Sequence, residues 1–139
     1  MQFIVALAAF AGVALAQSTS IALPKAGDTV AAGSDLVVQI QRPDTLTGSD
    51  EIVVAIGMVS CPGETTCPSA GEALGNLLYH GSFDPDFGTG SYYPYENFTI
   101  TVPSSFAAGN AQVNVAHLST YGASGETLYE TYDQTVVIS

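Results

Sequence analysis

Short runs in which every second residue is apolar recur along the chain, and this period of two is typical of half-buried β-strands. In residues 98–102 (FTITV) phenylalanine, isoleucine and valine alternate with threonine, and residues 113–117 (VNVAH) continue the pattern up to His117. Pro103 ends the first run, because proline lacks the amide N–H that a strand needs for its ladder. We therefore predict two strands connected by a loop over residues 104–110.

The same pattern predicts strands along the rest of the chain. Predicted strands cover residues 21–24, 36–41, 51–59, 75–83 and 127–139, and a short extended piece lies between two turns within residues 25–33. The segment 51–59 is rich in valine and isoleucine on both faces, as in a strand near the centre of a sheet. Polar, turn-rich loops are expected at 44–50, 60–75 and 84–90. Regular turns without a convincing long helix predict an all-β fold, an immunoglobulin-like antiparallel β-sandwich of about seven to eight strands.

The first 16 residues, MQFIVALAAFAGVALA, form an apolar run without a charged side chain. They end in Ala14-Leu15-Ala16, the A-x-A pattern of a signal-peptide cleavage site. The run is shorter than the roughly 20 residues of a membrane-spanning helix. We therefore expect residues 1–16 to be removed before Gln17. Residues 17–139 are then expected to form a single β-sandwich domain that is secreted and has no membrane anchor.

The charge of the chain is strongly unbalanced. There are 13 aspartate and glutamate residues against two cations, Lys25 and Arg42, and the formal net charge is −11. A nucleic-acid partner is not expected, because phosphate backbones are bound through clustered cations. Anionic membrane surfaces are disfavoured for the same reason.

Two cysteines are present, Cys61 and Cys67. A lone pair in an oxidising compartment is expected to form a disulfide. The alternative is a metal or redox site. It fits less well, because further Cys or His ligands are not nearby and the spacing exceeds that of a C-x-x-C motif.

We predict no catalytic residue, no metal site and no cofactor. His80 and His117 both lie in predicted strands without local partners, and they are interpreted as packed or edge residues rather than ligands. A copper-dependent polysaccharide oxidase exposes a histidine at its mature N-terminus, where this chain has Gln17. A G-x-S-x-G nucleophile elbow does not occur. Asp84 and Asp86 suggest calcium only weakly, because their order does not match an EF-hand loop.

Three tyrosines, Tyr92, Tyr93 and Tyr95, cluster beside a glycosylation motif. Exposed tyrosines anchor protein interfaces or sugars, whereas buried ones would cap the sandwich, so both interpretations stay open. Asn97-Phe98-Thr99 matches the acceptor pattern N-x-[ST], and Asn97 is the predicted N-glycosylation site.

The second half of the sequence resembles a known family. The matching fragments are ALGNLLYHGSFDP (73–85), YENFTITVP (95–103), VAHL (115–118), YGA (121–123) and TVVI (135–138). In this order and spacing they resemble the necrosis-inducing secreted protein family of fungal effectors. The resemblance implies a small secreted protein without enzymatic activity, which binds host receptor-associated immune kinases of plants, suppresses pattern-triggered immunity and can induce necrosis. It also implies an extracellular location, with the host cell as a further place of action.

Two alternatives stay open. The opening PKAGDTV (24–30) also occurs in wall-associated immunoglobulin-like domains of fungi, which favours a module that binds cell-wall polysaccharide. A secreted enzyme is the third reading, and no triad, metal cluster or cofactor motif in the sequence supports it.

Overall fold

The structure is a computed structural model of the chain, and it describes residues 19–43 and 48–139. The predicted signal peptide, its cleavage site and most of the predicted loop at 44–50 lie outside the described residues. Within them the chain forms eight strands and no helix, which confirms the all-β prediction. The strands are β1 (Ser20–Leu23), β2 (Asp28–Val30), β3 (Asp35–Gln41), β4 (Ser49–Ser60), β5 (Asn76–Gly81), β6 (Tyr95–Thr101), β7 (Gly109–Tyr121) and β8 (Glu126–Ile138).

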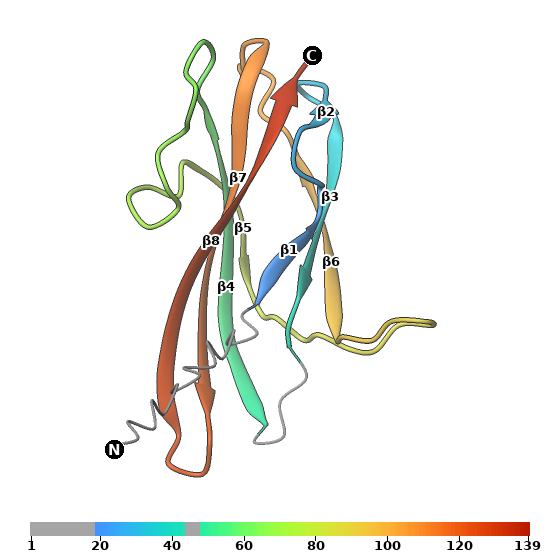
Figure 1. Cartoon of the computed structure of the whole chain (residues 1–139), viewed down its shortest axis with the longest axis vertical. Coiled ribbons are helices and arrows are strands. Elements are labelled where there is room, and N and C mark those ends of the chain that lie inside the picture. Colours follow the sequence, from blue (N-terminus) through green and yellow to red (C-terminus); the bar gives the residue numbers. More distant parts are fainter. Residues whose placement is uncertain (1–18, 44–47) are drawn as a thin grey trace, which may run out of the picture.

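The described strands form two sheets that face each other (Figure 1). The small sheet has the order β1-β3-β6, and the large sheet has the order β2-β8-β7-β4-β5. The sandwich-like arrangement is confirmed, whereas its immunoglobulin-like detail stays a prediction. One pair departs from the predicted antiparallel arrangement, because β2 runs parallel to β8. The strands β6 and β7 are consecutive, but they lie in different sheets, so the chain crosses between the layers after Pro103.

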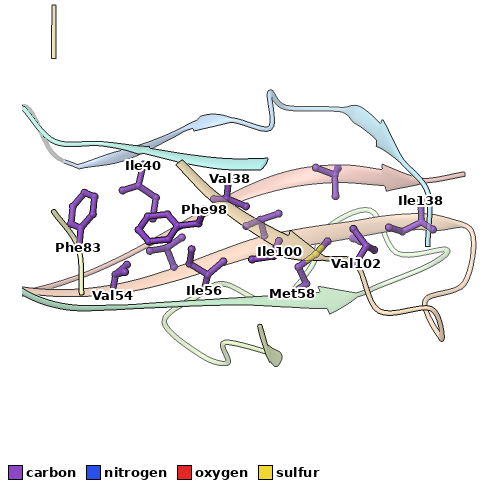
Figure 2. Packing of buried hydrophobic residues seen from close by; sticks show 14 residues of the cluster. Val38, Ile40, Val54, Ile56, Met58, Phe83, Phe98, Ile100, Val102 and Ile138 are labelled. Carbon is purple, nitrogen blue, oxygen red and sulfur yellow. The ribbon is translucent and has the colours of Figure 1, made fainter. Parts of the chain in front are cut away.

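The apolar positions of the alternating runs meet between the two sheets (Figure 2). Alternation forces this arrangement, because successive side chains of a strand point to opposite faces. Fully burying one such side chain contributes about 1.5–3 kcal/mol, so the alternating positions drive the closure of the sandwich. The core consists of Val38, Ile40, Val54, Ile56, Met58, Phe83, Phe98, Ile100, Val102, Ala111, Val113, Val115, Val136 and Ile138.

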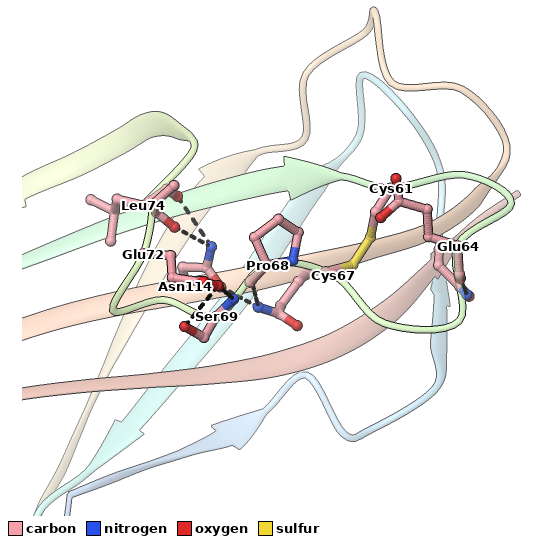
Figure 3. Close-up of a disulfide and its surroundings, with 11 residues drawn as sticks. Cys61, Glu64, Cys67, Pro68, Ser69, Glu72, Leu74 and Asn114 are labelled. Carbon is pink, nitrogen blue, oxygen red and sulfur yellow. Dashed lines mark hydrogen bonds between the residues drawn. A yellow bond between two sulfur atoms is a disulfide. The ribbon is translucent and has the colours of Figure 1, made fainter.

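The connection between β4 and β5 carries the disulfide and covers the outer face of β7 (Figure 3). Cys61 and Cys67 are bonded, with their Cα atoms 5.6 Å apart, which confirms the predicted pairing. The amide N–H of Cys61 donates to the carbonyl of Asn110 on β7. Closing so short a loop contributes about 2 kcal/mol in the chain-entropy account.

Two amide side chains on the outer face of β7 fasten this connection to the large sheet. Gln112 donates to the carbonyl of Pro68 at 2.8 Å and to Oδ1 of Asn114 at 2.9 Å. Asn114 donates to the carbonyl of Ala73 at 3.1 Å. Both side chains are buried, so these bonds satisfy polar groups that would otherwise cost free energy. As a result, β7 is buried on both faces along this part of its length.

Candidate functional site

The interior of the large sheet changes from apolar to polar along its length. On β7 the inward-facing positions run Val113, Val115, His117 and Ser119, and all four are buried. Opposite His117 in the register of β8 lies Glu130. Three neighbouring strands, β4, β7 and β8, thus carry the aliphatic core at one end and polar side chains at the other.

A β-bulge in β4 turns a third polar side chain, that of Glu51, towards the interior. The register between β4 and β7 shifts between Glu51 and Val53, so Ile52 is the extra residue. Val54 points into the core, and strict alternation would send Ile52 inward as well. The bulge leaves Ile52 48% exposed and turns Glu51 inward, with only 6% of its side chain exposed. Bulges re-aim side chains in this way, often next to functional sites.

Glu51 and Glu130 lie on opposite sides of the His117 ring. His117 Nε2 is hydrogen-bonded to a carboxylate oxygen of Glu51. His117 Nδ1 lies 3.6 Å from Oε2 of Glu130, which is too long for a hydrogen bond. The ring is 2% exposed, and its edge meets the ring of Phe83 at a centroid distance of 5.2 Å and an angle of 88°. His117 therefore lies at the boundary between the aliphatic core and the polar end.

Arg42, directly after β3, connects the small sheet to this cluster. Its Nη1 lies 3.4 Å from Oε1 of Glu51 and donates to the hydroxyl of Ser49 at 2.9 Å. The Ser49 hydroxyl donates to the same carboxylate oxygen at 3.0 Å. The backbone N–H of Arg42 donates to the carbonyl of Pro94. Glu51 thus receives bonds from both layers of the sandwich, and the ion pair ties the layers together at this end.

A pocket with a volume of about 150 Å³ opens beside the cluster. By the volume of liquid water this is room for about five water molecules or a small organic group. Charged groups and hydroxyls form part of its wall, and Leu128, Tyr121 and Pro43 supply apolar surface. The lining comprises Thr19, Arg42, Pro43, Ser49, Glu51, His117, Ser119, Tyr121, Leu128 and Glu130. We call this feature the His117 pocket.

The surroundings shift the ionisation of two side chains. Burial acts to raise the pKa of Glu51, but the hydrogen bond and the positive charge of protonated His117, the bond from Ser49 and the charge of Arg42 outweigh it. The pKa of Glu51 therefore lies below its ordinary value. Burial raises the pKa of the Tyr132 phenol far above its ordinary value, and the charges of Glu130 and Glu51 add to this. Glu51 is thus held charged and Tyr132 neutral.

Three buried polar atoms at this end have no hydrogen-bond partner among the described residues: Nε of Arg42, Nδ1 of His117 and the Tyr132 hydroxyl. Such atoms are rare in folded proteins and call for a specific explanation. Residues 19–43 and 48–139 contain no group of three or more His, Cys, Asp and Glu that is placed to hold a metal ion. In the same ranges no helix is long and apolar enough to cross a membrane.

The tyrosine cluster does not belong to the polar cluster around His117. Its residues lie in the connection between β5 and β6. This connection, yellow in Figure 1, projects away from both sheets. Tyr92 is 88% exposed and Tyr93 is 41% exposed. Phe87, in the same connection, is 55% exposed. The sequence pattern gave no sign of it, because it lies among turn residues. We call Phe87, Tyr92 and Tyr93 the aromatic loop.

Tyr95 has a different place from the other two tyrosines. It is half-buried at the start of β6 and forms a β-bridge with Asp86 at the base of the aromatic loop. A Cβ atom on Gly88 would lie 2.1 Å from the Tyr95 hydroxyl oxygen, so the ring packs directly over this glycine. Tyr95 therefore holds the base of the loop, while Tyr92 is almost fully exposed and Tyr93 is partly exposed.

The structure separates the two histidines that the sequence placed in strands. His80 is exposed on the edge strand β5, where it pairs with Ala55 of β4. His117 is packed, as expected, but between acidic side chains that β4 and β8 supply. Because these partners come from other strands, the local sequence carried no signal for them. The inward row of β7 gave the one hint, since His117 continues an otherwise apolar set.

Two solved structures show a low structural similarity to the chain. One is a superoxide reductase (neelaredoxin) from Ignicoccus hospitalis, with a TM-score of 0.46, 12% identity, and coverage of 86% of this chain and 80% of that chain. The other is a variant form of the same protein, and it gives the same values. Likeness at this level does not support an inference about activity.

Sequence comparison gives a closer relationship. A necrosis-inducing secreted protein 1 from Colletotrichum higginsianum (strain IMI 349063) is 32% identical over 143 residues, covering 99% of this chain and 91% of that protein. The family model of the Nis1 family matches residues 14–137. The match runs through the aromatic loop, the disulfide loop and all the strands that form the His117 pocket. The chain therefore belongs to the Nis1 family.

Proposed function

We propose that this protein is a secreted, effector-like protein of fungal type that acts by binding a host protein and has no enzymatic activity. Membership of the Nis1 family, with a relative named as a necrosis-inducing secreted protein, is the observation that carries the proposal. By the family resemblance, the partner is a receptor-associated immune kinase of plants. Binding would suppress pattern-triggered immunity, and necrosis would be a further outcome. The place of action is extracellular, with the host cell as a second location.

The aromatic loop is the proposed contact surface. Tyr92 and Tyr93 offer large, rigid side chains that lose little conformational entropy on binding, and such residues dominate binding energy at interfaces. The net charge of −11 would steer the protein towards a basic face of its partner. Phe87 extends the apolar area of the loop.

Affinity capture from plant extract tests the proposal. The purified protein should retain receptor-associated kinases, and Tyr92→Ala with Tyr93→Ala should weaken retention at least about tenfold. Tyr129→Ala is the matched control, because Tyr129 is 66% exposed on β8, away from the loop. Capture no better than that by an unrelated acidic β-sandwich would contradict the proposal. Retention on chitin, glucan or cellulose, lost in the loop variant, would favour the polysaccharide-binding alternative.

Secretion and glycosylation are proposed with the same function. Asn97 lies on the outer face of the small sheet, and its Oδ1 accepts a bond from Gln39 Nε2 at 3.0 Å. A glycan attaches at Nδ2, so this bond is compatible with modification. Protein secreted from a fungal host should begin at Gln17, and Asn97→Gln should lower its mass by one glycan. An N-terminus that retains residues 1–16 would contradict secretion by signal peptide.

A further inference from the structure

Both nitrogens of the His117 ring face carboxylates. Nε2 is hydrogen-bonded to Glu51 of β4, and Nδ1 lies 3.6 Å from Oε2 of Glu130 of β8, within the range of an ion pair. The ring is 2% exposed, and Nδ1 is buried without a hydrogen-bond partner among the described residues. Bulk water therefore does not reach Nδ1, and the polar group beside it is the Glu130 carboxylate.

This arrangement fits a charged ring better than a neutral one. A neutral imidazole has a single N–H, so one of its nitrogens would turn a lone pair towards a carboxylate. Two acceptors that face each other away from water repel, because the protein interior screens charge less than water does. The imidazolium ion carries an N–H on both nitrogens, so it presents a donor to each carboxylate. The geometry therefore favours the doubly protonated form of His117.

The charges around the ring balance when it is doubly protonated. Glu51 and Glu130 supply two negative charges, Arg42 supplies one positive charge through its 3.4 Å contact with Glu51, and the imidazolium supplies the second. Among the described residues, these are the side chains that form ion pairs with the ring or with its partners. Tyr132 of β8 stays neutral, because burial raises its pKa far above the ordinary value. Phe83, which packs on the ring edge, carries no charge.

The ion pairs join three strands at the polar end of the large sheet. Glu51 comes from β4, His117 from β7 and Glu130 from β8, and β7 lies between the other two strands. Arg42 follows β3 and ties the small sheet to Glu51. Loss of one proton from the ring would leave two carboxylates with Arg42 alone, and one ring nitrogen would face a carboxylate as an acceptor. The core at the aliphatic end consists of apolar side chains, so pH does not act on it in this way.

We propose that His117 is a pH-sensitive switch for the polar end of the large sheet. As an imidazolium ion it holds β4 and β8 to β7 through Glu51 and Glu130, and when it loses its second proton this end of the sheet opens more often. The folded arrangement stabilises the protonated ring, so the link is present on the acid side of the ring's titration and is lost on the alkaline side. The switch lies apart from the aromatic loop, so it goes beyond the proposed function, and a failure of kinase capture would leave it unaffected.

NMR spectroscopy of the ¹⁵N-labelled wild-type protein tests the switch without a variant. A long-range ¹H–¹⁵N spectrum reports the protons on both ring nitrogens, and His80, which is exposed on β5, gives a reference in the same spectrum. His117 should be doubly protonated at neutral pH and should lose one proton as the pH is raised. A His117 ring that carries a single proton at neutral pH would overturn the proposal.

Amide hydrogen exchange along β7 measures the opening, because β7 has a neighbouring strand on both sides. The exchange rates are first corrected for their intrinsic rise with pH. The amides of Leu118 and Ser119, at the polar end, should then exchange at least about fivefold faster once the ring has lost its second proton. Those of Val113 and Val115, at the aliphatic end, should change less than about twofold. Equal changes at the two ends, or no change at the polar end, would contradict the switch.

Replacing each histidine separates the switch from other effects of pH. His117→Gln keeps a polar side chain that cannot titrate, so the corrected exchange at the polar end should become independent of pH. His80→Gln makes the same change at an exposed position, and it should leave the pH dependence of the wild type in place. Both variants are first checked for a native, dispersed spectrum. A folded His117→Gln that keeps the pH dependence of the wild type would rule the switch out.

Replacing one carboxylate tests what holds the second proton. Glu130→Gln keeps the shape of the side chain but removes its charge, so His117 should lose its second proton at a lower pH than in the wild type. Glu126→Gln makes the same change at an exposed position at the start of β8, and it should leave the titration of the ring almost unchanged. A folded Glu130→Gln whose ring titrates like that of the wild type would overturn the proposal.

Discussion

The two ends of the large sheet are built by the same strands, yet they hold different chemistry. At one end Ile56 of β4 and Val115 of β7 face the small sheet in a dry aliphatic core. At the other end Glu51, His117 and Glu130 occupy the equivalent inward positions. The aliphatic end is stabilised by burial that needs no partners, whereas each polar group at the other end depends on a specific bond. The comparison teaches that alternation, and at Glu51 the bulge that shifts it, decides which side chains point inward, but not which partners they meet there.

The largest loss of stability is expected from removing buried side-chain atoms at the aliphatic end. Ile56→Ala should lower the free energy of unfolding by about 2–5 kcal/mol, because the fully buried side chain leaves a cavity. Ile52→Ala removes the same atoms from the same strand at the bulge, where the side chain is 48% exposed. It should cost less than about 1 kcal/mol. Urea denaturation measures both. Equal losses would show that the bulge does not turn Ile52 outward.

The next effect comes from breaking the polar end. Glu51→Ala should lower the free energy of unfolding by about 2–3 kcal/mol, because it leaves the buried His117 ring and Arg42 without their shared acceptor. The double variant Glu51→Leu with His117→Leu removes both groups, and most of the loss should return. Urea denaturation of the two variants decides the point. A double variant less stable than Glu51→Ala would mean that the polar end cannot be replaced by apolar packing.

The pH dependence of the unfolding free energy at acid pH should depend on Glu51. Its pKa is lowered in the folded protein from an ordinary value of 4.5, so the unfolded chain takes up the proton first as the pH falls. The stabilisation by Glu51 is therefore complete above about pH 4.5 and is lost as the pH falls through the folded pKa. Glu51→Gln should flatten the pH dependence of the unfolding free energy below about pH 4.5. Glu126→Gln, at an exposed position, should leave the slope like that of the wild type.

The smallest effect is expected at the boundary between the two ends. Tyr132→Phe removes a buried hydroxyl that has no partner among the described residues, so stability at neutral pH should stay the same or rise by up to about 1 kcal/mol. Burial raises the pKa of Tyr132, so the unfolded chain loses this proton first above about pH 10 and the wild type is destabilised there. Thermal unfolding should show a smaller alkaline loss in Tyr132→Phe. A clear loss of stability at neutral pH would reveal a bond made by the hydroxyl.

The sequence predicted the strands well because alternation is a local signal. The runs at 98–102 and 113–117 fall on β6 and β7, and the predicted strand at 127–139 falls on β8. The disulfide was predictable because the apolar N-terminal segment indicates secretion, and a lone pair of cysteines in an oxidising compartment is expected to form a bond. The crossing between sheets after Pro103 and the parallel pairing of β2 with β8 were not predictable, because a period of two does not say which strands are neighbours.

The amino-acid sequence by itself determined the all-β class, the Cys61–Cys67 pair and the family, since each depends on composition, spacing or residue order. Only the tertiary structure decided the polar end. Glu51 reaches the interior because a bulge shifts its strand by one residue, and that shift depends on pairing with β7 rather than on residues near Glu51. Glu130 meets His117 through the register of β8. Contacts of this kind join residues far apart in the sequence, so they exist only once the sheet has formed.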